Sequence, residues 1–157
     1  RNITKERIVR DLGTLRRALI EDFGIVEPRI AVMALNPHAG DGGLLGREEQ
    51  EIIRPAIVEA FSKGVLAFGP FAADGLFAGG GYAKYDGILA MYHDQGLAPF
   101  KSLSPDGVNF TAAAATSRSR TCRRPKRRID KDPNKNTGQP GGVFRLVIVE
   151  APKAPKT

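Results

Sequence analysis

Apolar residues recur at helical spacing near the start of the chain. Between residues 4 and 23 they lie three or four positions apart, which places them on one face of a predicted helix. They are Ile8, Leu12, Leu15, Leu19 and Phe23. Thr4 suits the N-cap position and Gly24 the residue just past the end. We therefore expect an amphipathic helix that packs on a core.

Three continuous apolar runs follow, at residues 29–35, 65–68 and 87–92. Runs of this kind are typical of strands buried in a parallel sheet. A second amphipathic helix is predicted over residues 48–63, between the first two runs. Strands that alternate with helices predict an α/β fold with a parallel or mixed sheet flanked by helices. In such folds ligands bind beyond the carboxyl ends of the strands.

The pattern changes at residue 112. Residues 116–142 carry no apolar periodicity, and a last strand is expected only at residues 143–149. We therefore divide the chain into an α/β region, residues 1–111, and a basic tail, residues 112–157. The charge follows this division approximately. Residues 1–117 hold 12 Lys/Arg against 14 Asp/Glu, a net charge of −2, and residues 118–157 hold 12 against 3, a net charge of +9.

Composition excludes several classes of protein. The chain has 157 residues, 41% of them hydrophobic, which suits one ordinary domain with a core. The single cysteine, Cys122, excludes an internal disulfide framework and fits a reducing compartment. No apolar run is long enough for a membrane span, and residues 1–7 contain no apolar signal segment. We expect a cytoplasmic protein.

The chain has two histidines, His38 and His93, in matching contexts. Each follows a predicted strand and opens a glycine-containing turn beside an acid, Asp41 or Asp94. Neutral imidazole is a common ligand of divalent metals, so the pair predicts part of a metal site. The alternative is that each histidine only caps or hydrogen-bonds its own loop. Two histidines do not complete a site, which needs at least three protein ligands.

Residues 36–43 form a glycine-rich loop between a strand and a helix. Its backbone N–H groups can converge on a phosphate, supported by the N-terminus of the helix that follows. The loop matches no established phosphate-binding motif, and a plain strand–helix connection explains it equally well.

Three further residues are candidates for chemistry. Lys101 and Asn109 lie after His93 in a segment that reads as a loop containing Pro and Gly. They offer a cation for phosphate and a neutral donor, although a solvated lysine is the ordinary alternative. Asp74 is either an acid/base group or an N-cap for a following turn.

Several of these segments together resemble a known family. They are LNPHAGDGG at 35–43, LGREE at 45–49, GP with AD and LF within 69–77, YDGILAMYHDQGL at 85–97, and VN with T at 108–111. In order and spacing they are similar to the signature of 4-hydroxythreonine-4-phosphate dehydrogenases. The resemblance covers about residues 3–111.

The resemblance implies an isocitrate/isopropylmalate dehydrogenase-like α/β architecture, present here as a partial domain, with active sites at a homodimer interface. It also implies NAD-dependent oxidation and decarboxylation of 4-phosphohydroxy-L-threonine to 3-amino-2-oxopropyl phosphate, a step in the vitamin B6 pathway that yields pyridoxal phosphate. A divalent metal such as zinc, magnesium or cobalt would polarise the reacting hydroxyl.

Site residues are carried over by position in the matching motifs. His38 and His93 correspond to two of three metal-binding histidines, and Asp74 and Asp94 to acidic catalytic residues. Lys101 and Asn109 match substrate-binding positions. The loop residues Asn36, Gly40, Gly42 and Gly43 are expected to bind the cofactor.

Departures from the family leave other functions open. The sequence after Thr111 does not match the family, and the third histidine is absent, so we expect negligible activity from this chain alone. Residues 118–131 are rich in Arg and Lys and lack aromatic side chains, which predicts salt-sensitive, sequence-blind binding of nucleic acid as an alternative. A related dehydrogenase of phosphorylated sugar acids or of dihydrodiols is a further alternative.

Overall fold

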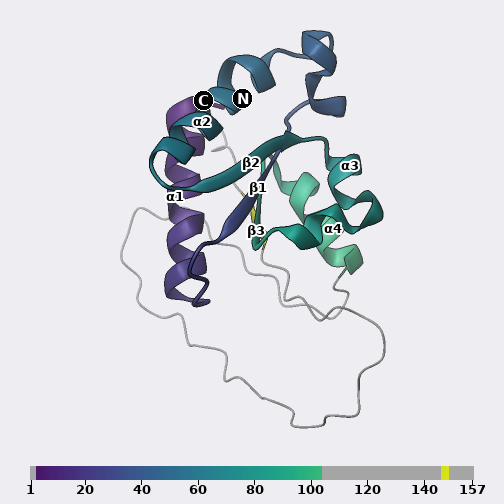
Figure 1. The fold of residues 1–157 in the computed structure, drawn as a ribbon. Coiled ribbons are helices and arrows are strands. Elements are labelled where there is room, and N and C mark those ends of the chain that lie inside the picture. The colour runs from purple at the N-terminus through teal and green to yellow at the C-terminus, as the bar shows by residue number, and fades with distance from the viewer. Residues whose placement is uncertain (1–2, 104–145, 149–157) are drawn as a thin grey trace, which may run out of the picture.

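The structure, a computed structural model, describes residues 3–103 and 146–148. Helices and strands alternate along the chain (Figure 1). The α-helices are α1 (Lys5–Glu21), α2 (Arg54–Ser62), α3 (Ala73–Phe77) and α4 (His93–Leu103). The shorter helical turns are η1 (Pro37–Gly43), η2 (Glu49–Ile53) and η3 (Ala78–Lys84). The strands are β1 (Arg29–Met33), β2 (Leu66–Phe71), β3 (Gly87–Ala90) and β4 (Leu146–Ile148).

The four described strands form one sheet in the order β2-β1-β3-β4, and every pairing is parallel. The expectation of an α/β fold with a parallel sheet is therefore confirmed. The last strand, expected at residues 143–149, is present as β4 beside β3. The proposed boundary between residues 1–111 and 112–157 stays a prediction.

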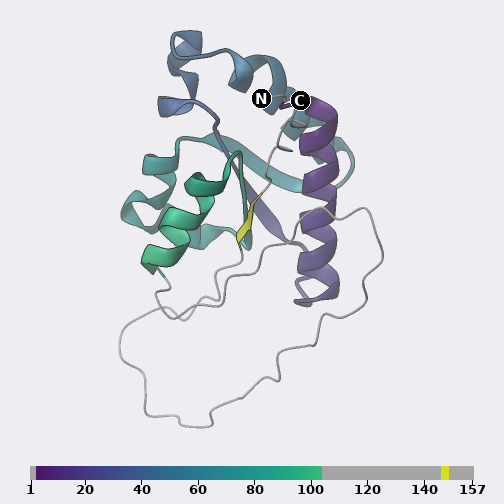
Figure 2. The ribbon, with the colours of Figure 1, turned by 180° about the vertical axis from the view of Figure 1, so that it is seen from behind.

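The two faces of the sheet are covered unequally. Helices α1 and α2 pack on one face, and α3 and α4 lie on the other (Figures 1 and 2). Alternation along β1 sends Ile30 and Val32 to the first face and Ala31 and Met33 to the second. The first face carries fourteen buried apolar residues and the second carries five, so most of the core lies beneath α1 and α2.

Helix α1 follows the expected pattern closely. Its buried face includes the four predicted leucine and isoleucine positions from residue 8 to residue 19, whereas Phe23 lies beyond the helix and is exposed. Thr4 is the N-cap, and its side-chain oxygen accepts a hydrogen bond from the Arg7 N–H at 3.3 Å. Gly24 has φ +70° and donates to the carbonyl of Ile20 at 3.0 Å, which closes the helix as expected.

One expected loop is helical instead. The segment after His93 was expected to be a turn leading to a loop with Lys101, but residues 93–103 form α4. Gln95 and Gly96 are buried, and α4 contacts both β3 and β4. Packing on the sheet therefore outweighs the low helix propensity of Gly96 and Pro99.

Among residues 3–103, no helix is long and apolar enough to cross a membrane.

Candidate functional site at the carboxyl ends of the strands

The two histidines follow neighbouring strands. His38 lies in η1 after β1, and His93 begins α4 after β3. The chain leaves β1 toward β2 on one side and returns to β3 on the other, so the strand order reverses between β1 and β3. Such a switch point is where α/β sheets form ligand sites. Both side chains are exposed there.

Gln95 closes the gap between the two strand ends. The backbone hydrogen-bond ladder between β1 and β3 extends as far as the pair Val32–Leu89. Two residues further along each strand, the Gln95 side chain accepts a hydrogen bond from the Met91 N–H at 2.8 Å. It also donates to the Ala34 carbonyl at 2.6 Å. The carboxamide is buried and replaces one rung of the ladder.

Glu49 anchors the loop that follows β1. Its side chain is 1% exposed, and one carboxylate oxygen accepts from the N–H groups of Leu35 and Asn36 at 2.8 and 2.7 Å. The other accepts from Asn36 Nδ2 at 3.0 Å, which also donates to Glu48 at 2.7 Å. These bonds to donors satisfy a buried charge that would otherwise be costly.

The Glu49 carboxylate occupies N–H groups at the start of the loop that could otherwise bind a phosphate. From the sequence, the loop is either a phosphate cradle formed by its N–H groups and the next helix or a plain strand–helix connection. At Leu35 and Asn36 these donors already serve Glu49. A bound anion would therefore rely on other groups of the loop or on charged side chains. Asn36 and Gly40, expected to bind cofactor, face Glu49 inside the loop, whereas Gly42 is exposed.

The η1 turn is left-handed. Residues 38–42 all have positive φ, and three of them, His38, Ala39 and Asp41, are not glycine. This region costs an L-residue about 1–2 kcal/mol. Gly40 lies at the tightest point, because a Cβ there would be 2.7 Å from Glu49 Oε2 and 2.9 Å from the Gly46 carbonyl oxygen. The turn presents His38 outward while its interior packs on Glu49.

The acidic candidates lie along the same edge. Asp74 is in the first turn of α3, just after β2, and its carboxylate accepts from the Gly75 N–H at 2.8 Å. The N-cap of α3 is Ala72, so Asp74 does not hold that position. Asp94 is exposed in the first turn of α4. Residues after three adjacent strands thus converge on one edge of the sheet.

The other candidates are not brought to this edge. Lys101 is exposed in the last turn of α4, about 12 Å along the helix axis from His93 at 1.5 Å per residue. Asn109 and the basic residues 118–131 lie outside the described residues. Within residues 3–103, no three His, Cys, Asp or Glu side chains gather closely enough to hold a metal ion. The metal site of His38 and His93 stays a prediction.

Sequence reasoning assigned no role to Glu49 or Gln95. A signal existed for Glu49, because it lies on the apolar stripe of the second predicted helix, four residues before Ile53 and seven before Ala56. A charged residue at such a position requires buried partners. No comparable signal marks Gln95, whose role depends on the register of two distant strands.

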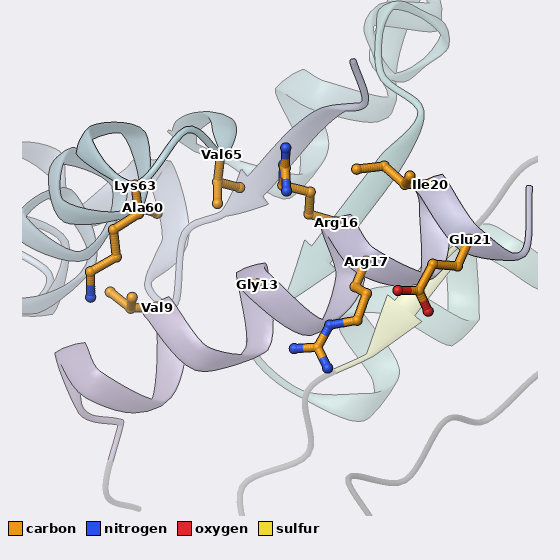
Figure 3. A pocket seen from close by; sticks show the side chains of 9 residues that line it. All are labelled: Val9, Gly13, Arg16, Arg17, Ile20, Glu21, Ala60, Lys63 and Val65. Carbon is orange, nitrogen blue, oxygen red and sulfur yellow. The ribbon is translucent and has the colours of Figure 1, made fainter. Parts of the chain in front are cut away.

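A separate groove of about 410 Å³ lies away from this edge (Figure 3). It runs between α1 and the end of α2 and is lined by nine residues. They are Val9, Gly13, Arg16, Arg17, Ile20, Glu21, Ala60, Lys63 and Val65. Val65 directly precedes β2, so the groove lies toward the amino ends of the strands and contains none of the predicted site residues.

The chain has an α/β fold with a parallel sheet, and two of the candidate site residues, His38 and His93, follow the strands at its topological switch point. Residues 1–119 match the model of the family described as pyridoxal phosphate biosynthetic protein PdxA, and the chain belongs to this family. The expected family membership is therefore confirmed.

Curated relatives carry the name 4-hydroxythreonine-4-phosphate dehydrogenase. One from Bacteroides thetaiotaomicron is 61% identical over 118 residues, which is 74% of this chain and 32% of the relative. One from Prosthecochloris aestuarii is 58% identical over 100 residues, 63% of this chain and 29% of the relative. The chain thus spans about a third of the length of these relatives.

Solved structures of dehydrogenases share the fold of this chain. A 4-hydroxythreonine-4-phosphate dehydrogenase from Klebsiella pneumoniae superposes with a TM-score of 0.61 at 42% identity, covering 65% of this chain and 30% of that one. A terephthalate 1,2-cis-dihydrodiol dehydrogenase from Burkholderia xenovorans gives a TM-score of 0.57 at 35% identity, covering 64% and 31%. The family names support an oxidoreductase connected with pyridoxine biosynthesis.

Proposed function

We propose that this chain supplies part of a domain for the NAD-dependent oxidation of 4-phosphohydroxy-L-threonine. In this reaction bound NAD⁺ would serve as the acceptor of a hydride from the substrate carbinol, with release of a proton, and the resulting β-keto acid would lose carbon dioxide to give 3-amino-2-oxopropyl phosphate. The 61% identity to a relative named for this activity is the observation that carries the proposal. The enzyme would work in the cytoplasm as a homodimer with its active site at the interface.

The residues at the strand ends fit a divalent metal as part of a larger ligand set. His38 and His93 offer imidazole nitrogens at the switch point, and the exposed carboxylates of Asp41 and Asp94 offer oxygens nearby in sequence. When bound, the metal polarises the substrate hydroxyl. A complete set requires at least one ligand from outside the described residues.

The other residues would bind and orient the reactants. Lys101 supplies a positive charge for the substrate phosphate and Asn109 a neutral donor. Asp94 and Asp74 would accept a proton, and their positions in the first turns of α4 and α3, after β3 and β2, support this role. The exposed Gly42 and the half-buried Gly43 would offer backbone to the cofactor, and Asn36 and Gly40 would shape the loop.

A chimera tests the proposal. Residues 1–118 of this chain replace the matching segment of the Bacteroides relative, and NADH formation is measured with 4-phosphohydroxythreonine, NAD⁺ and added zinc. We expect activity near that of the relative, and loss of at least about a hundredfold on His93→Ala. An inactive but folded chimera, or one indifferent to His93→Ala, would contradict the proposal.

The 157-residue chain alone is expected to have negligible turnover in the same assay. Its described residues bring no three metal ligands together, and misplacement by about 1 Å can cost on the order of a hundredfold in rate. Robust NADH formation that disappears on His93→Ala would show that the half-site present here is sufficient.

A cyclic diol is the second candidate substrate. The structural similarity to a cis-dihydrodiol dehydrogenase favours it, since that protein shares the same fold at 35% identity. The chimera distinguishes the two, because a diol enzyme would reduce NAD⁺ with a cis-dihydrodiol and would not require a phosphate on its substrate.

A further inference from the structure

The strands β1 and β3 are tied together by side chains at both ends. At the amino end, Asp86 Oδ2 accepts from the Arg29 N–H at 2.8 Å, and the Asp86 N–H donates to the Arg29 carbonyl at 2.8 Å. At the carboxyl end, Gln95 joins Met91 to Ala34. The two ties hold the same pair of strands, but only the Gln95 tie lies at the end that carries the histidines.

Gln95 is connected to both histidines through short segments of fixed backbone. It lies two residues after His93 in the first turn of α4. Its other partner, Ala34, is followed by Leu35 and Asn36, whose N–H groups are held by Glu49. The Ala34 N–H also donates to the Phe71 carbonyl at 2.7 Å, which secures it to β2.

We infer that Gln95 is a positioning residue that sets the separation of His38 and His93. A carboxamide carries one acceptor and two donors, so it can bridge a peptide N–H on one strand and a carbonyl on the other as a peptide group does. With Gln95 in place, the start of α4 is fixed against the end of β1. This inference rests on the proposed function, because it concerns the histidine pair of that site.

Zinc binding tests the inference, with the chimera proposed above as the parent chain, because its ligand set is not limited to the residues of this chain. Asp86 provides a matched control. Gln95→Ala and Asp86→Ala each remove one side-chain tie between β1 and β3. We expect Gln95→Ala to weaken zinc binding in calorimetry about tenfold, the usual effect of losing a group that orients a metal ligand. It should also alter the visible absorption band of bound cobalt. Asp86→Ala should stay within about twofold of the parent chain, although it lowers stability in urea.

Each result has a distinct meaning. If the Gln95→Ala variant binds zinc like the parent chain and its cobalt band is unchanged, the inference is overturned and the proposed site stays intact. Equal weakening by Asp86→Ala would overturn it too, since the effect would then be general loosening of the sheet. If His38→Ala and His93→Ala both bind zinc like the parent chain, the proposed site and the inference fall together. Gln95→Met, which keeps the side-chain length without hydrogen bonds, replaces Gln95→Ala if that variant does not fold.

Discussion

The ends of β1 and β3 carry the two histidines in different ways. After β1 the chain enters a left-handed turn that is packed around the buried carboxylate of Glu49. After β3 it enters the ordinary right-handed helix α4, which is tied back by Gln95. The first end depends on special backbone conformations and on a buried charge, and the second depends on packing and one carboxamide. Substitutions at the two strand ends should therefore change the free energy of unfolding by different amounts.

The buried carboxylate explains how the β1 end sustains its strain. Three non-glycine residues in the left-handed region each cost about 1–2 kcal/mol, and such conformations persist only where the surroundings enforce them. Glu49 supplies that enforcement through its bonds to Leu35 and Asn36, just before the turn begins. Charge-assisted hydrogen bonds are roughly twice as strong as neutral ones.

The largest effect is expected for Glu49→Ala. It leaves the partly buried N–H groups of Leu35 and Asn36 without their acceptor and removes a fully buried side chain, so the free energy of unfolding should fall by about 3 kcal/mol in urea titrations. The neighbouring Glu48→Ala is the control, since Glu48 accepts one bond from Asn36 Nδ2 and is only half-buried. A loss below about 1 kcal/mol for Glu49→Ala would remove the distinction between the two strand ends.

Next in size is Gly40→Ala, compared with Gly42→Ala. Both glycines have positive φ, but a Cβ at Gly40 would meet Glu49 and the Gly46 carbonyl, whereas at Gly42 it would meet open space. We expect losses of about 2–4 kcal/mol and about 1 kcal/mol in thermal unfolding. Equal losses would mean that the turn does not pack tightly on Glu49.

The two strand ends also differ in how far their structure could be predicted from the sequence. Helix α1 and strands β1 and β3 were predictable because their apolar spacing records which face is buried. The left-handed turn was readable only as a glycine-rich loop, because His38 and Asp41 adopt positive φ under tertiary constraint. Helix α4 was missed because Gly96 and Pro99 are weak helix formers, and the packing that overrides them is not local.

The two histidines should respond to glycine with opposite signs. His38 has φ +51°, so His38→Gly relieves left-handed strain and should raise the free energy of unfolding by about 0.5–1 kcal/mol after the added chain entropy. His93 lies in the first turn of α4, and His93→Gly should lower it by about the same amount. Chemical denaturation of both variants measures the difference. A loss at both positions would contradict the strain assigned to the turn.

The smallest expected effect is the acid response of the β1 end through Glu48. Hydrogen bonds from backbone N–H groups and from the Asn36 side chain hold the pKa of the Glu48 carboxyl below its ordinary value of 4.5. Because folding lowers this pKa, the contribution of Glu48 to the stability of the fold is present at pH above the unfolded-state pKa and is lost as pH falls through the folded-state pKa.

NMR titration of the Glu48 side-chain carboxyl should give a midpoint below 4.5, with the Asn36 side-chain amide signals shifting along the same curve. Glu48→Gln should abolish that shift of Asn36. A Glu48 midpoint at or above 4.5 would show that the Asn36 amide is not held as the structure describes. The strain at the β1 end would then be supported by Glu49 alone.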